Sequence, residues 1–381
     1  MKIGYFANIA GPNRHNEYAQ VLDELREQAI FCEESGFDSI WFTEHHFGHE
    51  GYELVPNPLM VGADIAARTK RIRIGQAANI ITFWHPLRLV EDIALLDQLS
   101  KGRVEIGIGR GVYGREAVNL NPLADPKDQE QNRALFEETF KIMKDAMTNR
   151  FFSHSGNFYT FPHPGMKWNH PSSPASPEFM DMETGEINRM SIVPRPYQNL
   201  HPPIWQVIDT PRSIKWSAEN GVNGMFWMPT VKELKLRFEL YRQVASEAQG
   251  RNFELGEGLA LVRDCYVAET MEEAREHAAE AVLNTYRWIC HWRGLGNLMD
   301  PGEEVKPGTE LTYEFLHPRN LLFGTPDYIV EKIRELKDEL NLQSLLLWTT
   351  HIGLPHDKIM RSMKLFATEV MPKIKDFVKV Q

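Results

Sequence analysis

The sequence predicts an α/β fold of the TIM (β/α)8 barrel type, with insertions at its C-terminal face. Short apolar runs alternate with segments of helical periodicity along the chain, as they do in α/β folds. Several of these runs end abruptly on polar or charged residues, which suits strands that lead into an active-site face. The 381 residues hold about eight such β/α units in one domain, residues 1–381, which fits a barrel with insertions better than a Rossmann fold.

The predicted strands share an apolar run that stops on glycine, polar or ionisable residues. They lie at residues 1–7, 38–47, 72–79, 104–110, 204–210 and 344–351. The run at 38–47 is the most informative, because it ends on Glu44, His45 and His46. Ionisable groups at a strand end lie where a ligand can reach them and where neighbouring charges can adjust their pKa.

The predicted helices share apolar residues spaced three and four apart. They lie near residues 18–32, 86–101, 136–147, 231–245, 274–285, 329–340 and 359–370. Pro86 suits the first turn of its helix, and Lys101 followed by Gly102 is typical of a helix end.

Two stretches, residues 161–203 and 292–320, interrupt the alternation. The first contains many prolines, which exclude a long helix, and the second contains several Gly and Pro-Gly turns. Long loops in compact domains are usually functional lids or disordered segments. Because tryptophan and phenylalanine recur in and beside both stretches, we expect lids on the C-terminal face.

Composition narrows the class of protein. No apolar run reaches the roughly 20 residues of a membrane helix, and the N-terminus enters a strand without the zones of a signal peptide, so we expect a cytoplasmic protein without a membrane partner. The three scattered cysteines form neither a disulfide framework nor a zinc motif. A net charge of −10 and a pI near 5.8 argue against nucleic acid as the main partner.

Two short motifs match a known functional signature only in part. Residues 109–114 fit the pattern G-x-G-x-x-G, but Asn119 and Pro122 follow too soon for the long helix of a dinucleotide fold. A phosphate-binding glycine loop after a barrel strand stays open, and Arg110 would suit it. Glu44, His45 and His46 lack the H-E-x-x-H spacing, so we expect no metal site. A purely structural role for either histidine is the alternative on residue type alone.

Three segments give the chain a resemblance to the bacterial luciferase-like family of flavin-dependent monooxygenases, close to the luciferase catalytic subunit. These segments are residues 35–47, 85–103 and 362–366, and Gly324-Thr325-Pro326 before a helix is also typical of the family. The resemblance spans nearly the whole chain and weakens at 161–203. It independently implies a TIM barrel with insertions.

The resemblance implies roles for several residues. His45 matches the family's general base beside the flavin ring, and Arg110 and Arg133 match positions that hold the flavin phosphate. Ala77 and Ala78 match a non-proline cis peptide bond. Three further positions, Asp209, Thr210 and Ser213, match the family's acidic residue, here an aspartate in place of glutamate, and its hydroxyls near the phosphate. Gly109 replaces a reactive cysteine of luciferase.

The implied chemistry is that of a two-component monooxygenase. A separate reductase supplies reduced FMN, which reacts with O2 through a C4a-peroxyflavin to oxygenate a small apolar or aromatic substrate, whether aldehyde, ketone or ring. Tryptophans near predicted strand ends, including Trp84, Trp227 and Trp348, are candidates for lining that pocket. A homodimer is expected from the family, and a heterodimer stays open. Two alternatives are a deazaflavin-dependent oxidoreductase of the same superfamily and a non-catalytic flavin-binding relative.

Overall fold

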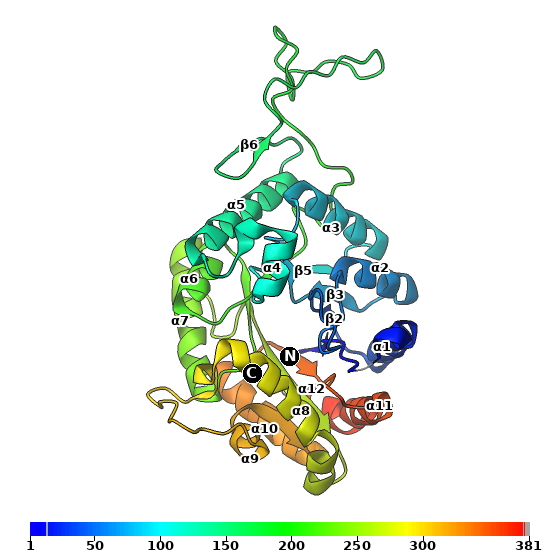
Figure 1. Cartoon of the computed structure of the whole chain (residues 1–381), viewed down its shortest axis with the longest axis vertical. Coiled ribbons are helices and arrows are strands. Elements are labelled where there is room, and N and C mark those ends of the chain that lie inside the picture. Colours follow the sequence, from blue (N-terminus) through cyan, green and yellow to red (C-terminus); the bar gives the residue numbers. More distant parts are fainter. Residues whose placement is uncertain (13, 376, 378–381) are drawn as a thin grey trace.

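Eight parallel strands close into a barrel in the computed structural model, which describes residues 1–12, 14–375 and 377 (Figure 1). In order around the ring the strands are β1 (Lys2–Ala7), β2 (Ser39–Phe42), β3 (Arg73–Gln76), β5 (Val104–Gly109), β8 (Ile204–Val207), β9 (Asn223–Phe226), β10 (Leu259–Val267) and β12 (Ser344–Trp348). The ring closes because β12 pairs with both β10 and β1. The predicted TIM barrel is therefore confirmed.

Helices form the outer layer of the barrel, as Figure 1 shows. The helices are α1 (Tyr18–Ser35), α2 (Pro58–Arg68), α3 (Pro86–Ser100), α4 (Gly114–Leu120), α5 (Gln129–Thr148), α6 (Pro211–Glu219), α7 (Val231–Gln249), α8 (Met271–Arg293), α9 (Tyr313–Asn320), α10 (Pro326–Leu340), α11 (His356–Leu365) and α12 (Met371–Lys375). Short turns of helix lie at η1 (His15–Glu17), η2 (Pro122–Ala124), η3 (Gly296–Leu298) and η4 (Phe366–Val370). None of the described helices is long and apolar enough to cross a membrane.

The helix ends follow the capping rules that the sequence displays. Threonines begin several helices, and those at positions 210, 230, 270 and 325 each accept a backbone N–H of the first turn. Such a cap contributes about 1 kcal/mol. The helix predicted from Pro86 ends as expected, with Lys101 in the left-handed region at φ +57° and Gly102 following at φ +83°.

Side chains fill the barrel interior and so define where a ligand can enter. All nine residues of β10 are buried, which is usual for a parallel strand covered on both faces. Trp41 of β2 lies over Gly75 of β3, where an added Cβ would approach its ring to 2.2 Å. A glycine at that position is what lets the indole cross the barrel.

Among the described residues, four short strands lie outside the ring. The predicted strand at 72–79 is divided, because β3 stops at Gln76 and β4 (Asn79–Ile80) then pairs with the end of β5. β11 (Leu321–Gly324) pairs with the second half of β10, beyond the part of β10 that closes the barrel. β6 (His154–Ser155) and β7 (Thr160–Phe161) form a separate antiparallel pair.

The stretch 161–203 does not cover the C-terminal face, which corrects the prediction of a lid there. It connects the end of α5 to the start of β8, so the chain must return to the N-terminal ends of the strands. Arg195 donates to the carbonyls that end α5, and Gln198 bonds Asp97 of α3 and the carbonyl of Val104. Figure 1 shows the stretch projecting outward beyond α3 and α5.

The stretch 292–320 begins at the C-terminal face. α8 continues to Arg293, well past the predicted helix at 274–285, and its last turns pass over the barrel mouth near the centre of Figure 1. Arg293 and Asn297 line the cavity at this face, and the part predicted as loop also contains η3 and α9.

Candidate functional site

A cavity of about 460 Å³ lies at the C-terminal ends of the strands, the face where TIM barrels carry their active sites. It is lined by residues from all eight ring strands or the loops that follow them, and by Ile289 and Arg293 of α8. Among its lining residues are Phe6, Glu44, His45, Glu53, Ala77, Ala78, Gly109, Arg110, Tyr113, Asp209, Thr210, Ser213, Trp227 and Trp348. Most of the residues predicted from the sequence therefore meet at one cavity.

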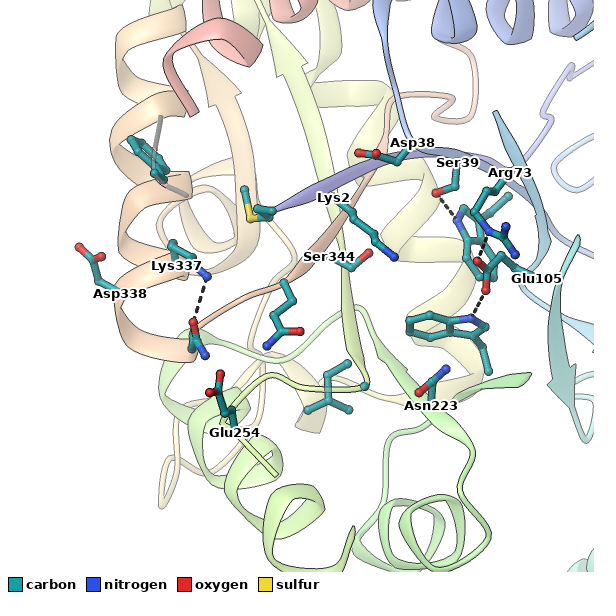
Figure 2. Close-up of a pocket in the computed structure, with 18 of the residues that line it drawn as sticks. Lys2, Asp38, Ser39, Arg73, Glu105, Asn223, Glu254, Lys337, Asp338 and Ser344 are labelled. Carbon is teal, nitrogen blue, oxygen red and sulfur yellow. Dashed lines mark hydrogen bonds and ion pairs between the residues drawn. The ribbon is translucent and has the colours of Figure 1, made fainter. Parts of the chain in front are cut away.

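A larger hollow of about 1110 Å³ lies at the opposite end of the barrel (Figure 2). It is lined by residues that begin strands, such as Lys2, Ser39 and Ser344. Its polar groups largely serve the fold: Arg73 pairs with Glu105, which also accepts the indole N–H of Trp205 at 2.7 Å. The N-terminal face of a TIM barrel serves stability rather than chemistry, so we take the smaller cavity as the candidate active site.

His45 is held between two carboxylates. Its Nε2 lies 3.2 Å from Glu53 Oε1, and its Nδ1 lies 3.3 Å from Glu116 Oε1. The His45 side chain is 18 % exposed, whereas those of Glu53 and Glu116 are 8 % and 2 % exposed. Burial alone would lower the pKa of His45, but the charge of Glu53 and the hydrogen bond to Glu116 outweigh it, so the pKa is raised.

Glu44 fastens the loop beside His45. It is buried and accepts the backbone N–H of Ile80 at 2.8 Å, His46 Nε2 at 3.0 Å and the indole N–H of Trp84 at 2.9 Å. Burial raises the pKa of Glu44, and these hydrogen bonds oppose that shift. Trp84 was predicted to line the substrate pocket, but the structure places it behind Glu44 and outside the cavity lining. Its role here is to orient the carboxylate.

The floor of the cavity contains a close approach of two strands. The peptide bond between Ala77 and Ala78 is cis, as the resemblance implied. Gly107 of β5 lies beside it, where an added Cβ would come within 1.6 Å of the carbonyl oxygen of Gln76. At Gly109, where the family resemblance expects a cysteine, an added Cβ would approach Ile80 to 3.0 Å, so the site has little room for a larger side chain.

A cluster of arginines lies at one edge of the cavity. Arg110 donates to Asn132 at 3.0 Å and to Gln129 at 3.2 Å. Burial lowers the pKa of Arg110, and the neighbouring guanidiniums of Arg133 and Arg212 lower it further. Arg133 does not line the cavity itself, but its Nε is buried and has no hydrogen-bond partner among the described residues. An anion placed between these groups would satisfy this donor and relieve the repulsion.

The N-terminus of α6 faces the same edge. Thr210 and Ser213 line the cavity, and each bonds the backbone N–H of the other in a capping box, at 3.1 and 3.3 Å. Their hydroxyls therefore order the first turn, whose positive end favours an anion.

Asp209 lines the cavity together with Thr210 and Ser213, and its carboxylate pairs with Arg293 of α8 at 2.6 Å. The pair ties α8 to the barrel on one side of the mouth. Trp288 donates to Glu53 at 3.0 Å and ties it on the other side.

Aromatic side chains form the remaining wall. The rings of Trp227 and Trp348 lie 4.8 Å apart, and Phe6 lies 5.0 Å from Trp348. Trp227 also donates to the buried Asp264 at 2.9 Å, which fixes its orientation. Both tryptophans border the cavity, as the strand-end positions predicted.

A closed barrel whose mouth gathers an ionisable cluster, a basic edge and an aromatic wall around one cavity is the architecture of a TIM-barrel enzyme. The family model for luciferase-like monooxygenases matches residues 1–341. The chain therefore belongs to the luciferase-like monooxygenase family, in agreement with the resemblance.

Two relatives match over nearly the full length of the chain. An alkanal monooxygenase alpha chain from Photorhabdus luminescens is 24% identical, covering 99% of this chain and 98% of its own length. The oxygenase component of a flavin-dependent trigonelline monooxygenase from Acinetobacter baylyi is 25% identical, covering 98% of this chain and 95% of its own.

Solved structures share the fold at lower identity. The oxygenating constituent of 3,6-diketocamphane monooxygenase from Pseudomonas putida, a type II Baeyer-Villiger monooxygenase in complex with FMN, superposes with a TM-score of 0.76 at 23% identity and 98% coverage of both chains. An F420-dependent secondary alcohol dehydrogenase superposes with a TM-score of 0.66 at 16% identity, again over 98% of both chains. The fold thus includes both monooxygenases and deazaflavin enzymes.

Proposed function

We propose that the protein is the oxygenase component of a two-component monooxygenase, which uses reduced FMN from a separate reductase and O2 to oxygenate a small apolar or aromatic substrate. The main support for this function is the basic edge formed by Arg110, Arg133 and the N-terminus of α6, which lies beside a cavity that also contains His45. Family membership, with relatives named as flavin-dependent oxygenases, supports the same assignment.

The residues present fit a flavin phosphate. The buried Nε of Arg133 has no acceptor within the part of the chain that the structure describes, and the guanidinium of Arg110 reaches the cavity beside it. Thr210 and Ser213 order the first turn of α6 toward the same edge. When bound, the reduced flavin supplies the electrons for O2 activation; the protein supplies binding, orientation and the exclusion of water.

The walls of the cavity favour an apolar or aromatic substrate. Phe6, Trp227 and Trp348 offer ring faces and edges, and the described part of this wall presents no charged side chain. Trp227 donates its N–H to Asp264, so its ring offers apolar contact area to a substrate and no free hydrogen-bond donor. An aldehyde, a ketone or an aromatic ring would each suit this surface.

The test is an anaerobic binding experiment followed by O2. Purified protein is titrated with reduced FMN and, separately, with a reduced deazaflavin, and the reoxidation of bound flavin is then followed by absorbance with H2O2 measured as product. We expect reduced FMN to bind, its reoxidation to be slower than in buffer, and His45→Ala to speed it. Binding of the deazaflavin alone would instead support an F420-type oxidoreductase, and tight FMN binding without slowed reoxidation would support a non-catalytic binder.

We further propose a homodimer and a cytoplasmic location. Met60 of α2 and Leu95 and Leu99 of α3 are 72%, 48% and 59% exposed, which leaves an apolar surface on two packed helices. All three cysteines are free and buried, which suits a reducing compartment. Size-exclusion chromatography with light scattering tests this proposal, because a homodimer should have twice the mass of the chain. A heterodimer would instead need a second, different chain to form a stable particle.

A further inference from the structure

Both ring nitrogens of His45 face carboxylate oxygens, and this geometry limits its protonation. A neutral imidazole carries one N–H and one lone pair, so it can donate to only one of two acceptors. Nδ1 forms a hydrogen bond with Glu116 at 3.3 Å, whereas Nε2 makes an ionic contact with Glu53 at 3.2 Å without hydrogen-bond alignment. The doubly protonated ring places its positive charge beside both carboxylates, whereas a neutral ring leaves one ring nitrogen without a proton next to one of them.

The two carboxylates are themselves held as acceptors. Glu53 receives the phenol O–H of Tyr113 at 3.2 Å and the indole N–H of Trp288 at 3.0 Å. Glu116 receives the backbone N–H of His46 at 2.7 Å. Both carboxylates therefore act as hydrogen-bond acceptors toward these donors, which fixes their oxygens beside the ring of His45.

We propose that Glu53 and Glu116 are positioning residues that hold His45 as the imidazolium, so that His45 serves the reaction as a proton donor and a positive charge rather than as a general base. This inference rests on the proposed function. It differs from the role that the family resemblance implied for His45, because the base in that role must begin without its second proton.

The other charged groups near His45 do not offset this arrangement. Glu44 adds a third carboxylate, which accepts hydrogen bonds from the backbone N–H of Ile80 and the indole of Trp84 and also contacts His46 Nε2. The guanidiniums of this region make their contacts elsewhere. Arg115 is bonded to Glu50 at 2.8 Å and Arg293 to Asp209 at 2.6 Å, while Arg110, which lines the same cavity, donates to Asn132 and Gln129. The phenol of Tyr113 stays protonated, since burial raises its pKa well above the ordinary value.

The proton step is balanced by these contacts. His45 Nε2 gives its proton to an anionic oxygen of a ligand in the cavity, and the N–H bond breaks as an O–H bond forms. The ring becomes neutral and keeps its proton on Nδ1, which continues to donate a hydrogen bond to Glu116. Glu53 then retains Tyr113 and Trp288 as donors, so no carboxylate is left without a partner.

The experiment is an NMR titration of the ligand-free protein, so its outcome does not depend on flavin binding or activity. Protein with ¹⁵N-labelled histidine is titrated between about pH 5 and pH 9, where histidines ordinarily change charge, and His45→Gln assigns the His45 signals. We expect both His45 nitrogens to carry protons well above the ordinary histidine pKa. A ring that is neutral at pH 7 in the wild-type protein would overturn the proposal, whatever the flavin experiment shows.

Two isosteric variants test the carboxylates. Glu53→Gln and Glu116→Gln should each lower the pKa of His45 by about 1 to 3, the usual effect of an adjacent charge. Glu27→Gln is the matched control, because Glu27 contacts His356 at 3.0 Å on the surface and should leave His45 unchanged. If both test variants fold and neither moves the His45 titration, the assignment is wrong. If either fails to fold, Tyr113→Phe removes a donor from Glu53 and should raise the pKa of His45.

Discussion

Replacing the arginines at the basic edge should weaken the binding of FMN but not of riboflavin, which lacks the phosphate. A hydrogen bond to a charged group contributes about 1.5–3 kcal/mol, so Arg110→Met or Arg133→Met should weaken FMN binding by roughly 10- to 150-fold. Arg110 also bonds Asn132 and Gln129, and losing those bonds affects both flavins alike. The ratio of the two dissociation constants therefore isolates the phosphate contact.

Arg212→Met is the control for this prediction. Arg212 lies close enough to lower the pKa of Arg110, yet its side chain is 58% exposed and pairs with Glu130 at 2.9 Å. An exposed charge of this kind is screened by salt, and its loss should change the FMN-to-riboflavin ratio by less than about 5-fold. Fluorescence titrations of both flavins at low and high salt measure these ratios. Equal losses for FMN and riboflavin would refute a phosphate site at this edge.

Three other predictions test separate parts of the structure. Arg293→Met and Asp209→Asn should each speed flavin dissociation by up to about 5-fold, measured by stopped-flow displacement, because an ion pair that fastens α8 is worth about 1 kcal/mol or less; an unchanged rate in both would mean that the pair does not restrain α8. Gly107→Ala should destabilise the protein by more than about 4 kcal/mol in urea denaturation, since its Cβ would collide with a backbone carbonyl, while Gly296→Ala, in open space, should be neutral. Burial raises the pKa of Asp264 to about 6, so ionisation of this group lowers the stability of the fold as the pH rises from about 4 to 6. Burial lowers the pKa of His351 to about 3, so this group has the opposite effect and increases the stability over the same pH range. Asp264→Asn should therefore make stability rise more steeply with pH there, and a slope equal to that of the wild type would contradict the raised pKa.

Local sequence patterns predicted the barrel because each β/α unit carries its own signals. The apolar run ending at His45 and the capped helix from Pro86 depend on neighbours within a few residues, and the structure shows both where they were expected. The position of the stretch 161–203 depends instead on direction along the barrel. A segment between a helix and the next strand returns to the N-terminal ends of the barrel strands. Neither its prolines nor its aromatic residues indicate on which face of the barrel it lies.

The carboxylates around His45 could not be identified from the sequence. Glu53 lies in a loop and Glu116 on the short helix α4, 71 positions from His45, and no spacing rule connects residues that meet only across the barrel mouth. Trp288 and Arg293 were missed for a related reason. The helical pattern was followed only to residue 285, although α8 continues to 293 and brings Arg293 to the cavity and Trp288 to Glu53.

Glu53 joins two parts of the site that would otherwise be independent, since it accepts hydrogen bonds from Trp288 on α8 and contacts His45. A displacement of α8 from the mouth would take the indole donor away from the same carboxylate that contacts His45. The placement of a helix over the cavity and the surroundings of the imidazole inside it therefore depend on one shared carboxylate, so a change at either end is expected to be felt at the other.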